Sequence, residues 1–273
     1  MTPAMRVEAR PGRRSATFAD AVRSEWTKIR TVRSTAYTLL GTVVLGVGAG
    51  ALISLARGRQ YASATAEEQA AFDPAAIGLS GYILAQCIIG VLGVLVVTSE
   101  YATGMIGTSL AAVPGRSRLL AAKSAVFAMV ALATGTTTAF AAFLVGQRLL
   151  AGNGAPHMTL GDPQALRAVL GAGLYLALVG LLGVAAGTLL RATAGAFAVV
   201  VTVTFLVPAF IPVLPESWAR PTGKFWPAMA GRQIMTVHQD PTLLAPWAGF
   251  GVLCAAVLVV LAAAFAVFRI RDV

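Results

Sequence analysis

Apolar residues come in six long blocks along this chain, and nearly all of the charged residues lie between the blocks. A helix needs about 20 predominantly apolar residues to cross about 30 Å of hydrocarbon at about 1.5 Å per residue. Each block is long enough, and none contains Asp, Glu, Lys or Arg. The pattern therefore predicts six membrane-spanning helices, approximately at residues 36–56, 78–97, 124–146, 168–190, 195–213 and 247–268.

The fifth block differs from the others because Pro208 and Pro212 interrupt its end. Proline lacks a backbone N–H, so we expect the helix to kink or end there, close to the membrane surface. The following segment, residues 214–246, is rich in aromatic side chains that favour the interface between lipid and water. We expect it to hold a short helix lying on the outer surface of the membrane.

Composition supports the same architecture. Hydrophobic residues make up 57% of the chain and charged residues only 12%, with a mean hydropathy of +0.77. A soluble domain carries about 25% charged residues. The prediction is an all-α polytopic membrane protein with six transmembrane helices, an N-terminal interfacial amphipathic helix and a cytoplasmic coupling helix.

The basic residues predict the orientation of the helices. If the N-terminus lies in the cytoplasm, the inner segments hold 14 Lys and Arg residues and the outer segments hold 7. This bias predicts that both termini are cytoplasmic. The net charge of +10 is then an orientation signal and an attraction to anionic lipid, and we expect no nucleic-acid partner. A long basic segment before the first block also argues against a secretory signal peptide.

The residues before the first block predict an amphipathic helix. At 100° per residue, one face of the segment 18–32 is apolar, whereas Arg23 and Arg30 lie on another face. The apolar face holds Phe18, Val22, Trp26, Ile29 and Val32. Glu25 lies on this apolar face, where it either pairs with Lys28 one turn later or reaches a partner, and the sequence leaves both open. Residues 1–35 are accordingly expected to form a cytoplasmic basic tail and connecting helix, and residues 36–273 the six-helix domain.

A second cytoplasmic element joins the second and third blocks. Ser99 is expected to cap a short helix with Glu100 in its first turn. Pro114 and Gly115 then predict a turn, followed by the basic residues Arg116, Arg118 and Lys123. A minimal connection needs only a few residues, so this segment indicates a platform for a cytoplasmic partner.

Three segments in this order resemble the landmarks of type-two ATP-binding-cassette (ABC) permeases. They are Ser24-Glu25-Trp26-Thr27-Lys28-Ile29-Arg30-Thr31-Val32-Arg33-Ser34 before the first block, Ser99-Glu100-Tyr101 through Ala111-Ala112-Val113-Pro114 after the second, and Phe225-Trp226-Pro227-Ala228-Met229-Ala230-Gly231 before the last. The resemblance covers the chain from about residue 15 onward.

The resemblance implies the permease subunit of an exporter in a bacterial plasma membrane. In such proteins the segment after the second span is a coupling helix that docks on a separate ATPase subunit. By position, the docking residues would be Glu100, Tyr101, Met105 and Ile106, with Glu25 and Trp26 on the connecting helix. The resemblance also implies pairing with a second copy or with a paralogous permease. ATP and Mg²⁺ would be bound by the partner, leaving this chain without a cofactor or metal.

The sequence offers no chemistry for ATP hydrolysis, because the motif Gly-x-x-x-x-Gly-Lys-Ser/Thr is absent. We therefore expect no enzyme and no catalytic residues in this chain. The mostly Leu, Val, Ile, Ala and Phe blocks favour an amphiphilic cargo, with Gln86 the most polar residue of the second block.

Two alternatives remain open. A secondary, ion-coupled transporter could use hydroxyl ligands such as those of Thr134, Thr136, Thr137 and Thr138, although hydroxyls of this kind more often bond within their own helix. A rhomboid-like intramembrane serine protease is suggested by Gly78-Leu79-Ser80-Gly81. That reading requires a histidine beside Ser80 to act as its base.

Overall fold

The computed structural model of the chain describes every residue except 1–16, 113–114 and 272–273. Most of the predicted basic tail, and Pro114 of the turn predicted at Pro114-Gly115, lie outside the described residues. The helices are α1 Phe18–Thr31, α2 Arg33–Tyr61, α3 Ala66–Ala70, α4 Pro74–Leu79, α5 Tyr82–Ala102, α6 Met105–Ala112, α7 Arg116–Gly152, α8 Ala165–Leu190, α9 Thr193–Val201, α10 Val207–Phe210, α11 Glu216–Phe225, α12 Pro227–Gly231 and α13 Pro246–Ile270. A π-helical turn, Thr202–Leu206, joins α9 to α10, and 3₁₀ turns cover Ile211–Val213 and Arg232–Met235.

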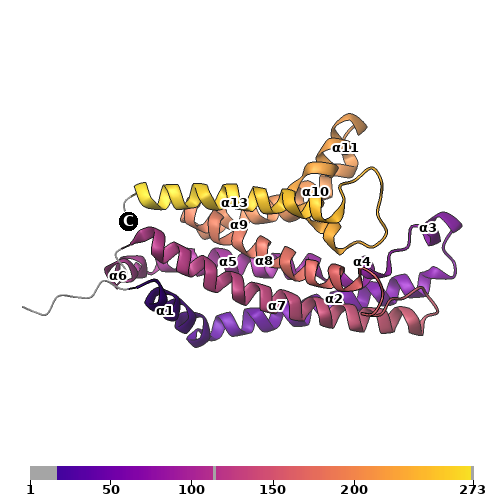
Figure 1. The fold of residues 1–273 in the computed structure, drawn as a ribbon, viewed down its shortest axis with the longest axis horizontal. Coiled ribbons are helices and arrows are strands. Elements are labelled where there is room, and N and C mark those ends of the chain that lie inside the picture. Colours follow the sequence, from indigo (N-terminus) through magenta and orange to yellow (C-terminus); the bar gives the residue numbers. More distant parts are fainter. Residues whose placement is uncertain (1–16, 113–114, 272–273) are drawn as a thin grey trace, which may run out of the picture.

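Six helices in the described part of the chain are long and apolar enough to cross a membrane, which confirms the predicted fold class. They are α2, α5, α7, α8, the composite helix Thr193–Val213 and α13. The long helices run along an elongated bundle (Figure 1), with α8 the most buried of the six. At 37 residues, α7 is about 55 Å long and extends beyond the hydrocarbon layer.

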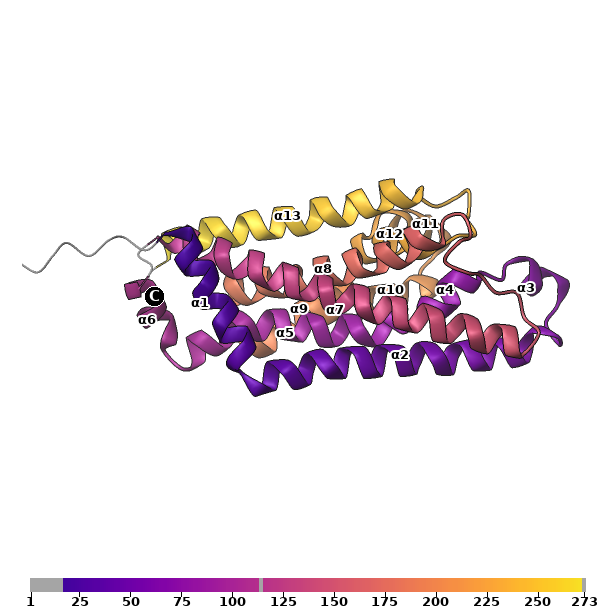
Figure 2. The same ribbon diagram turned by 60° about the horizontal axis from the view of Figure 1, so that its bottom comes forward.

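The bundle has two distinct ends. Helices α1 and α6 lie at the end of the bundle where α13 ends, which we call the proximal end. Helices α3, α4 and α11 lie at the opposite, distal end (Figure 1). Figure 2 shows α1 crossing obliquely over the proximal end of the long helices. Helix α1 starts at a capping box in which Thr17 and Asp20 bond to each other's backbone N–H, and it stops where Val32 becomes extended.

The second membrane helix begins at Tyr82, later than the predicted Gly78. The preceding apolar residues form the separate helix α4, which Asp73 caps and Pro74 begins. Between the two helices, Gly81 packs directly on the backbone of α2, where a side chain would overlap the carbonyl of Gly46. This close approach turns the chain before α5 and explains the displaced start.

Glycines also set the packing of α5 on α8. A Cβ atom at Gly93 would overlap the carbonyl oxygen of Gly180, and one at Gly183 would overlap that of Gly90. Small residues at such crossings let two membrane helices approach backbone to backbone. These glycines therefore serve packing within the bundle.

Replacing Gly93 with valine is expected to disrupt the bundle, because the new side chain would have to displace backbone atoms of α8. We expect a lower thermal midpoint and a smaller folded yield in detergent, measured by size-exclusion chromatography after heating. Gly48→Val is the matched control, since nothing lies within 4 Å of a Cβ at that position in α2. Equal stability of the two variants would contradict the packing account.

The fifth membrane helix changes its hydrogen bonding before Pro208, where a kink was predicted. The N–H of Val207 bonds to the carbonyl of Thr202, five residues back, and thus leaves the carbonyl of Val203 free. The indole N–H of Trp226 donates to this freed carbonyl at 2.7 Å. An aromatic side chain from the segment 214–246 therefore supplies the hydrogen bond that the helix backbone does not make at this carbonyl.

A second carbonyl is freed by the proline itself, because Pro208 has no N–H to offer to Thr204. The amide of Gln86 in α5 makes a long contact of 3.5 Å with this carbonyl, and its oxygen accepts a hydrogen bond of 2.8 Å from the hydroxyl of Tyr175 in α8. Gln86 is buried. The most polar residue of the second block thus satisfies polar groups inside the chain.

Candidate functional site

Four charged side chains meet at the proximal end of the bundle. Lys28 Nζ lies 2.8 Å from Glu25 Oε1 and 2.8 Å from Glu100 Oε1. Lys123 Nζ lies 2.7 Å from Glu25 Oε2 and 2.8 Å from Glu100 Oε1. We call these four residues the charge cluster. Each ammonium touches both carboxylates, so the two positive and two negative charges balance.

The charge cluster lies largely out of water. Glu25, Glu100 and Lys123 are 3%, 6% and 4% exposed, while Lys28 is the partly open member. Each lysine completes three hydrogen bonds, because Lys28 also donates to the hydroxyl of Ser109 at 3.2 Å and Lys123 to the carbonyl of Val96 at 3.3 Å. Buried charges are tolerated when they are paired in this way.

The Lys28 ammonium is held in its charged form. Burial alone would lower its pKa, but hydrogen bonds to Glu100 and Glu25 more than offset that effect and raise the pKa above the ordinary value. A raised lysine pKa stabilises the fold below the unfolded-state pKa, and the contribution is lost only as the pH rises through the folded-state value. Lys28 therefore stays charged and paired at neutral pH.

The charge cluster connects four helices. Glu25 and Lys28 come from α1, Glu100 from α5 and Lys123 from α7, while Ser109 brings in α6. Sequence reasoning left Glu25 with either a local pair to Lys28 or a partner, and the structure shows both, because its second oxygen binds Lys123. A displacement of α1 therefore acts directly on α5 and α7.

The short helix of the platform begins later than predicted. Ser99 is not its cap, because Ser99, Glu100 and Tyr101 form the last turns of α5 and the Ser99 hydroxyl bonds to Leu95 within that helix. Helix α5 ends where Gly104 takes a positive φ of 69°, a conformation that glycine adopts without strain. The new helix, α6, then starts at Met105.

The predicted docking residues divide into buried and exposed groups. Glu25, Glu100 and Ile106 are buried, and the ring of Tyr101 packs beneath the guanidinium of Arg191 with 5.1 Å between Arg191 Cζ and the ring centroid. Trp26 on α1 and Met105 on α6 are 42% and 49% exposed. We call the exposed sides of α1 and α6, which carry these two side chains, the proximal surface. The charge cluster ties both helices to α5 and α7.

At the distal end, one carboxylate joins two segments far apart in the sequence. Asp73 Oδ1 accepts the N–H of Ala76, and Oδ2 accepts the N–H groups of Val237 and His238 at 2.7 and 2.8 Å. The carboxylate thereby caps α4 and holds the loop before α13 in place. Sequence reasoning missed this contact because its partners are backbone groups 164 and 165 residues away.

Asp73→Ala is expected to destabilise the distal end by about 2 to 4 kcal/mol, because hydrogen bonds to a charged acceptor are lost and backbone N–H groups are left unpaired. Limited proteolysis should show faster cleavage in residues 236–245. Asp240→Ala is the control, since the hydrogen bonds of that carboxylate to other described residues go to Thr242 in an exposed turn. Cleavage at the same rate in both variants would show that Asp73 does not hold the loop.

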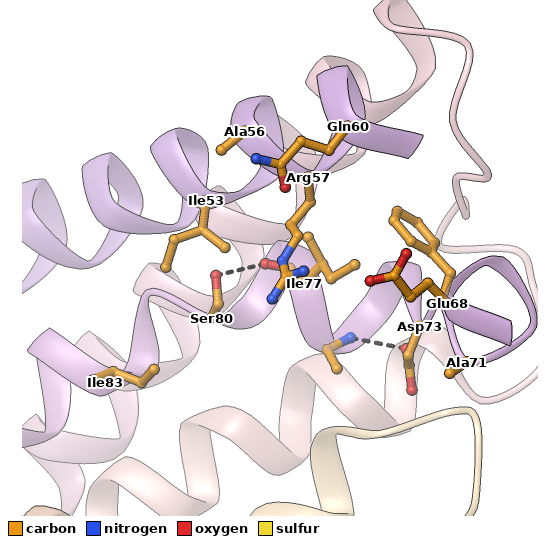
Figure 3. A pocket seen from close by; sticks show the side chains of 12 residues that line it. Ile53, Ala56, Arg57, Gln60, Glu68, Ala71, Asp73, Ile77, Ser80 and Ile83 are labelled. Carbon is orange, nitrogen blue, oxygen red and sulfur yellow. Dashed lines mark hydrogen bonds between the residues drawn. The ribbon is translucent and has the colours of Figure 1, made fainter. Parts of the chain in front are cut away.

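A cavity of about 750 Å³ also lies at the distal end, between α2, α3 and α4. Figure 3 shows Arg57 extending from α2 toward α4, with Glu68 of α3 and the apolar Ile53 and Ile83 at its sides. The hydroxyl of Ser80 donates to the carbonyl of Ile77 at 2.7 Å (Figure 3). The Ser80 hydroxyl thus donates its proton to the backbone three residues earlier. No hydrogen bond joins it to a histidine in the described part of the chain.

Two of the four threonines considered for ion coupling donate their hydroxyl within their own helix. Thr137 donates to the carbonyl of Ala133 and Thr138 to that of Thr134, both at 2.8 Å, along the unbroken helix α7. Ion sites in secondary transporters use helix breaks that free carbonyl oxygens. This stretch of α7 has no such break, so the geometry does not favour an ion site there.

One comparison with known proteins gives a match. The model of a family described as "ABC-2 family transporter protein" matches residues 21–209, which run from the first turn of α1 into α10. No curated protein matches the chain. The matched range contains the charge cluster, α6, four of the six membrane helices in full and most of the composite helix Thr193–Val213.

Proposed function

From the premise that this chain belongs to the ABC-2 transporter family, we propose that it is the membrane subunit of an exporter driven by a separate ATPase subunit. The observation that carries the proposal is the charge cluster, which joins α1 and α6 to the membrane helices α5 and α7. In this proposal ATP and Mg²⁺ are bound by the ATPase, and this chain carries the movement into the membrane.

The proposed docking surface is the exposed side of α1 and α6. Trp26 and Met105 are large apolar side chains that face outward beside buried groups, as binding hot spots do. Glu25, Glu100, Tyr101 and Ile106 act behind this surface. Glu25 and Glu100 hold α1 against α5, so they position the docking residues and transmit displacement.

The proximal end is proposed to lie in the cytoplasm of a bacterial cell, on the basis of the Lys and Arg bias. The complex would contain two membrane subunits, either two copies of this chain or this chain and a paralogue. The spans are almost free of ionisable residues, which favours an amphiphilic cargo over a small hydrophilic ion.

Purification of the full chain from its own membrane in mild detergent tests this proposal. We expect a soluble protein bearing a phosphate-binding loop to accompany it in stoichiometric amount, identified by mass spectrometry, and ATP hydrolysis in the purified complex. A chain that purifies alone and moves a solute down an ion gradient would contradict the proposal and favour a secondary transporter.

A further inference from the structure

The link between the fourth and fifth membrane helices lies at the proximal end, next to the end of α5. Helix α8 ends at Leu190 and α9 begins at Thr193, so two residues join them. The first of these, Arg191, donates its backbone N–H to the carbonyl of Gly187 at 2.9 Å and closes the last turn of α8. Because the link is so short, any displacement of it moves the start of α9.

The backbone of Arg191 has a left-handed conformation, with φ 54° and ψ 12°. Glycine is the residue that most often ends a helix in this conformation, because it has no Cβ to clash. An arginine is less favourable there, so ending α8 does not by itself call for this side chain. The contacts of the side chain therefore indicate what it does.

The Arg191 side chain reaches the end of α5. Its Cζ atom lies 5.1 Å from the ring centroid of Tyr101, which is a cation–π contact. Tyr101 directly follows Glu100, whose carboxylate binds both lysines of the charge cluster. Arg191 Nη2 also donates a long hydrogen bond of 3.5 Å to the carbonyl of Arg271, just after α13. The guanidinium thus connects the end of α5 with the link between α8 and α9.

A second contact joins the same two segments. Thr193, the first residue of α9, donates its hydroxyl to the hydroxyl of Thr98 in α5 at 2.9 Å. The Thr98 hydroxyl in turn donates to the carbonyl of Val94 at 3.1 Å, so it can accept the bond from Thr193. Thr98 lies about one helical turn before Tyr101. The last turns of α5 therefore hold the start of α9 at two places.

The fifth membrane helix is built to respond to such a displacement. In α9 the buried residues are Ala196 and Val200, whereas Phe197 and Val199 are exposed. The π-helical turn that follows α9, together with Pro208 beyond it, interrupts the regular hydrogen bonding. Helices bend at prolines and at π-bulges. A displacement at the start of α9 can therefore tilt α9 about this turn.

We propose that Arg191 is a positioning residue that couples the charge cluster to the fifth membrane helix. When the ATPase displaces α1 and α6, Glu100 moves the end of α5, and Arg191 carries this movement into α9. The inference rests on the proposed function for its role in transport, and it adds which membrane helix receives the movement. The coupling itself is a property of this chain, so it can be measured without the ATPase.

The test is a double-mutant cycle, followed by amide hydrogen exchange of residues 193–201 in the full chain in detergent. Lys28→Met loosens the charge cluster and should speed this exchange about tenfold, a factor typical of coupled sites. In the Arg191→Gly background, the same change should alter the exchange by less than about twofold. Glycine suits the left-handed backbone, so we expect this variant to fold. Arg191→Asn, which also tolerates that conformation, serves if it does not.

Two matched variants separate coupling from a general loss of stability. Arg30→Met removes a cation from the exposed side of α1 and should leave the exchange unchanged. Arg191→Lys keeps a cation over the ring of Tyr101, so this background should retain most of the response to Lys28→Met. If Arg191 served only to end α8, Arg191→Gly would leave that response intact.

An equal response in the Arg191→Gly background would overturn the proposal, and so would the absence of any response to Lys28→Met in the otherwise unchanged chain. Either result would leave the proposed function standing, because the measurement contains no ATPase. Failure to find an ATPase partner would likewise leave a measured coupling between α1 and α9 intact.

Discussion

Lys123→Met is expected to lower the free energy of unfolding by about 3 to 5 kcal/mol, because it removes one cation from a buried, balanced group of four charges. Two carboxylates would then share Lys28 alone. For a chain of this size the loss corresponds to a fall in the thermal midpoint of roughly 10 °C in detergent. Thermal unfolding followed by the remaining monodisperse fraction measures it.

Two further variants make this result specific. Arg220→Met breaks an ion pair whose side chains are 81% and 86% exposed, and we expect no measurable change from it. Lys123→Met combined with Glu100→Gln leaves Glu25 and Lys28 as a neutral pair, so this double variant should regain much of the lost stability. A single variant as stable as the wild type would mean that the charge cluster does not hold α1 to the bundle.

Trp26→Ala is expected to weaken binding of the proposed ATPase subunit by about 2 kcal/mol, or roughly 30-fold in Kd, as loss of an interface hot spot does. The side chain is 42% exposed on α1, so its removal should leave the fold of this chain unchanged. Titration of the ATPase subunit onto the chain in nanodiscs measures the affinity, and the stimulated rate of ATP hydrolysis should fall in parallel.

Trp218→Ala provides the control at the other end of the molecule. This tryptophan is 69% exposed on α11, at the distal end, and its removal should not change ATPase binding. Affinity that falls in both variants would indicate a general effect on the bundle. Affinity that falls in neither would remove α1 from the docking surface.

The membrane helices could be predicted because the bilayer imposes their length and composition directly on the sequence. The amphipathic character of the segment 18–32 was visible for a similar reason, since its periodicity is local. Glu25 stood out because a charge on an apolar face demands a partner. Local pattern also indicated Lys28 as that partner, one helical turn away.

Other features depend on contacts between distant residues. In the sequence, Lys123 is one of several basic residues before the third apolar block, with nothing to distinguish it from the others. The crossing of α1 over α7 brings its Nζ to 2.7 Å from Glu25 Oε2. The start of α6 was misplaced because Ser99 and Glu100 are compatible with a helix start, whereas the left-handed conformation of Gly104 sets the actual break. The role of Asp73 could not be predicted, because backbone N–H groups leave no signature in the sequence.

The central claim is that the proximal surface docks a separate ATPase, and photo-crosslinking tests it most directly. A photoreactive amino acid would replace Met105 in the full chain, in the membrane of cells that make it, with the same substitution at Trp218 for comparison. We predict an adduct from position 105 with a soluble protein that bears a phosphate-binding loop, and none from position 218. Adducts with such a protein only from position 218, or from neither position, would contradict the account.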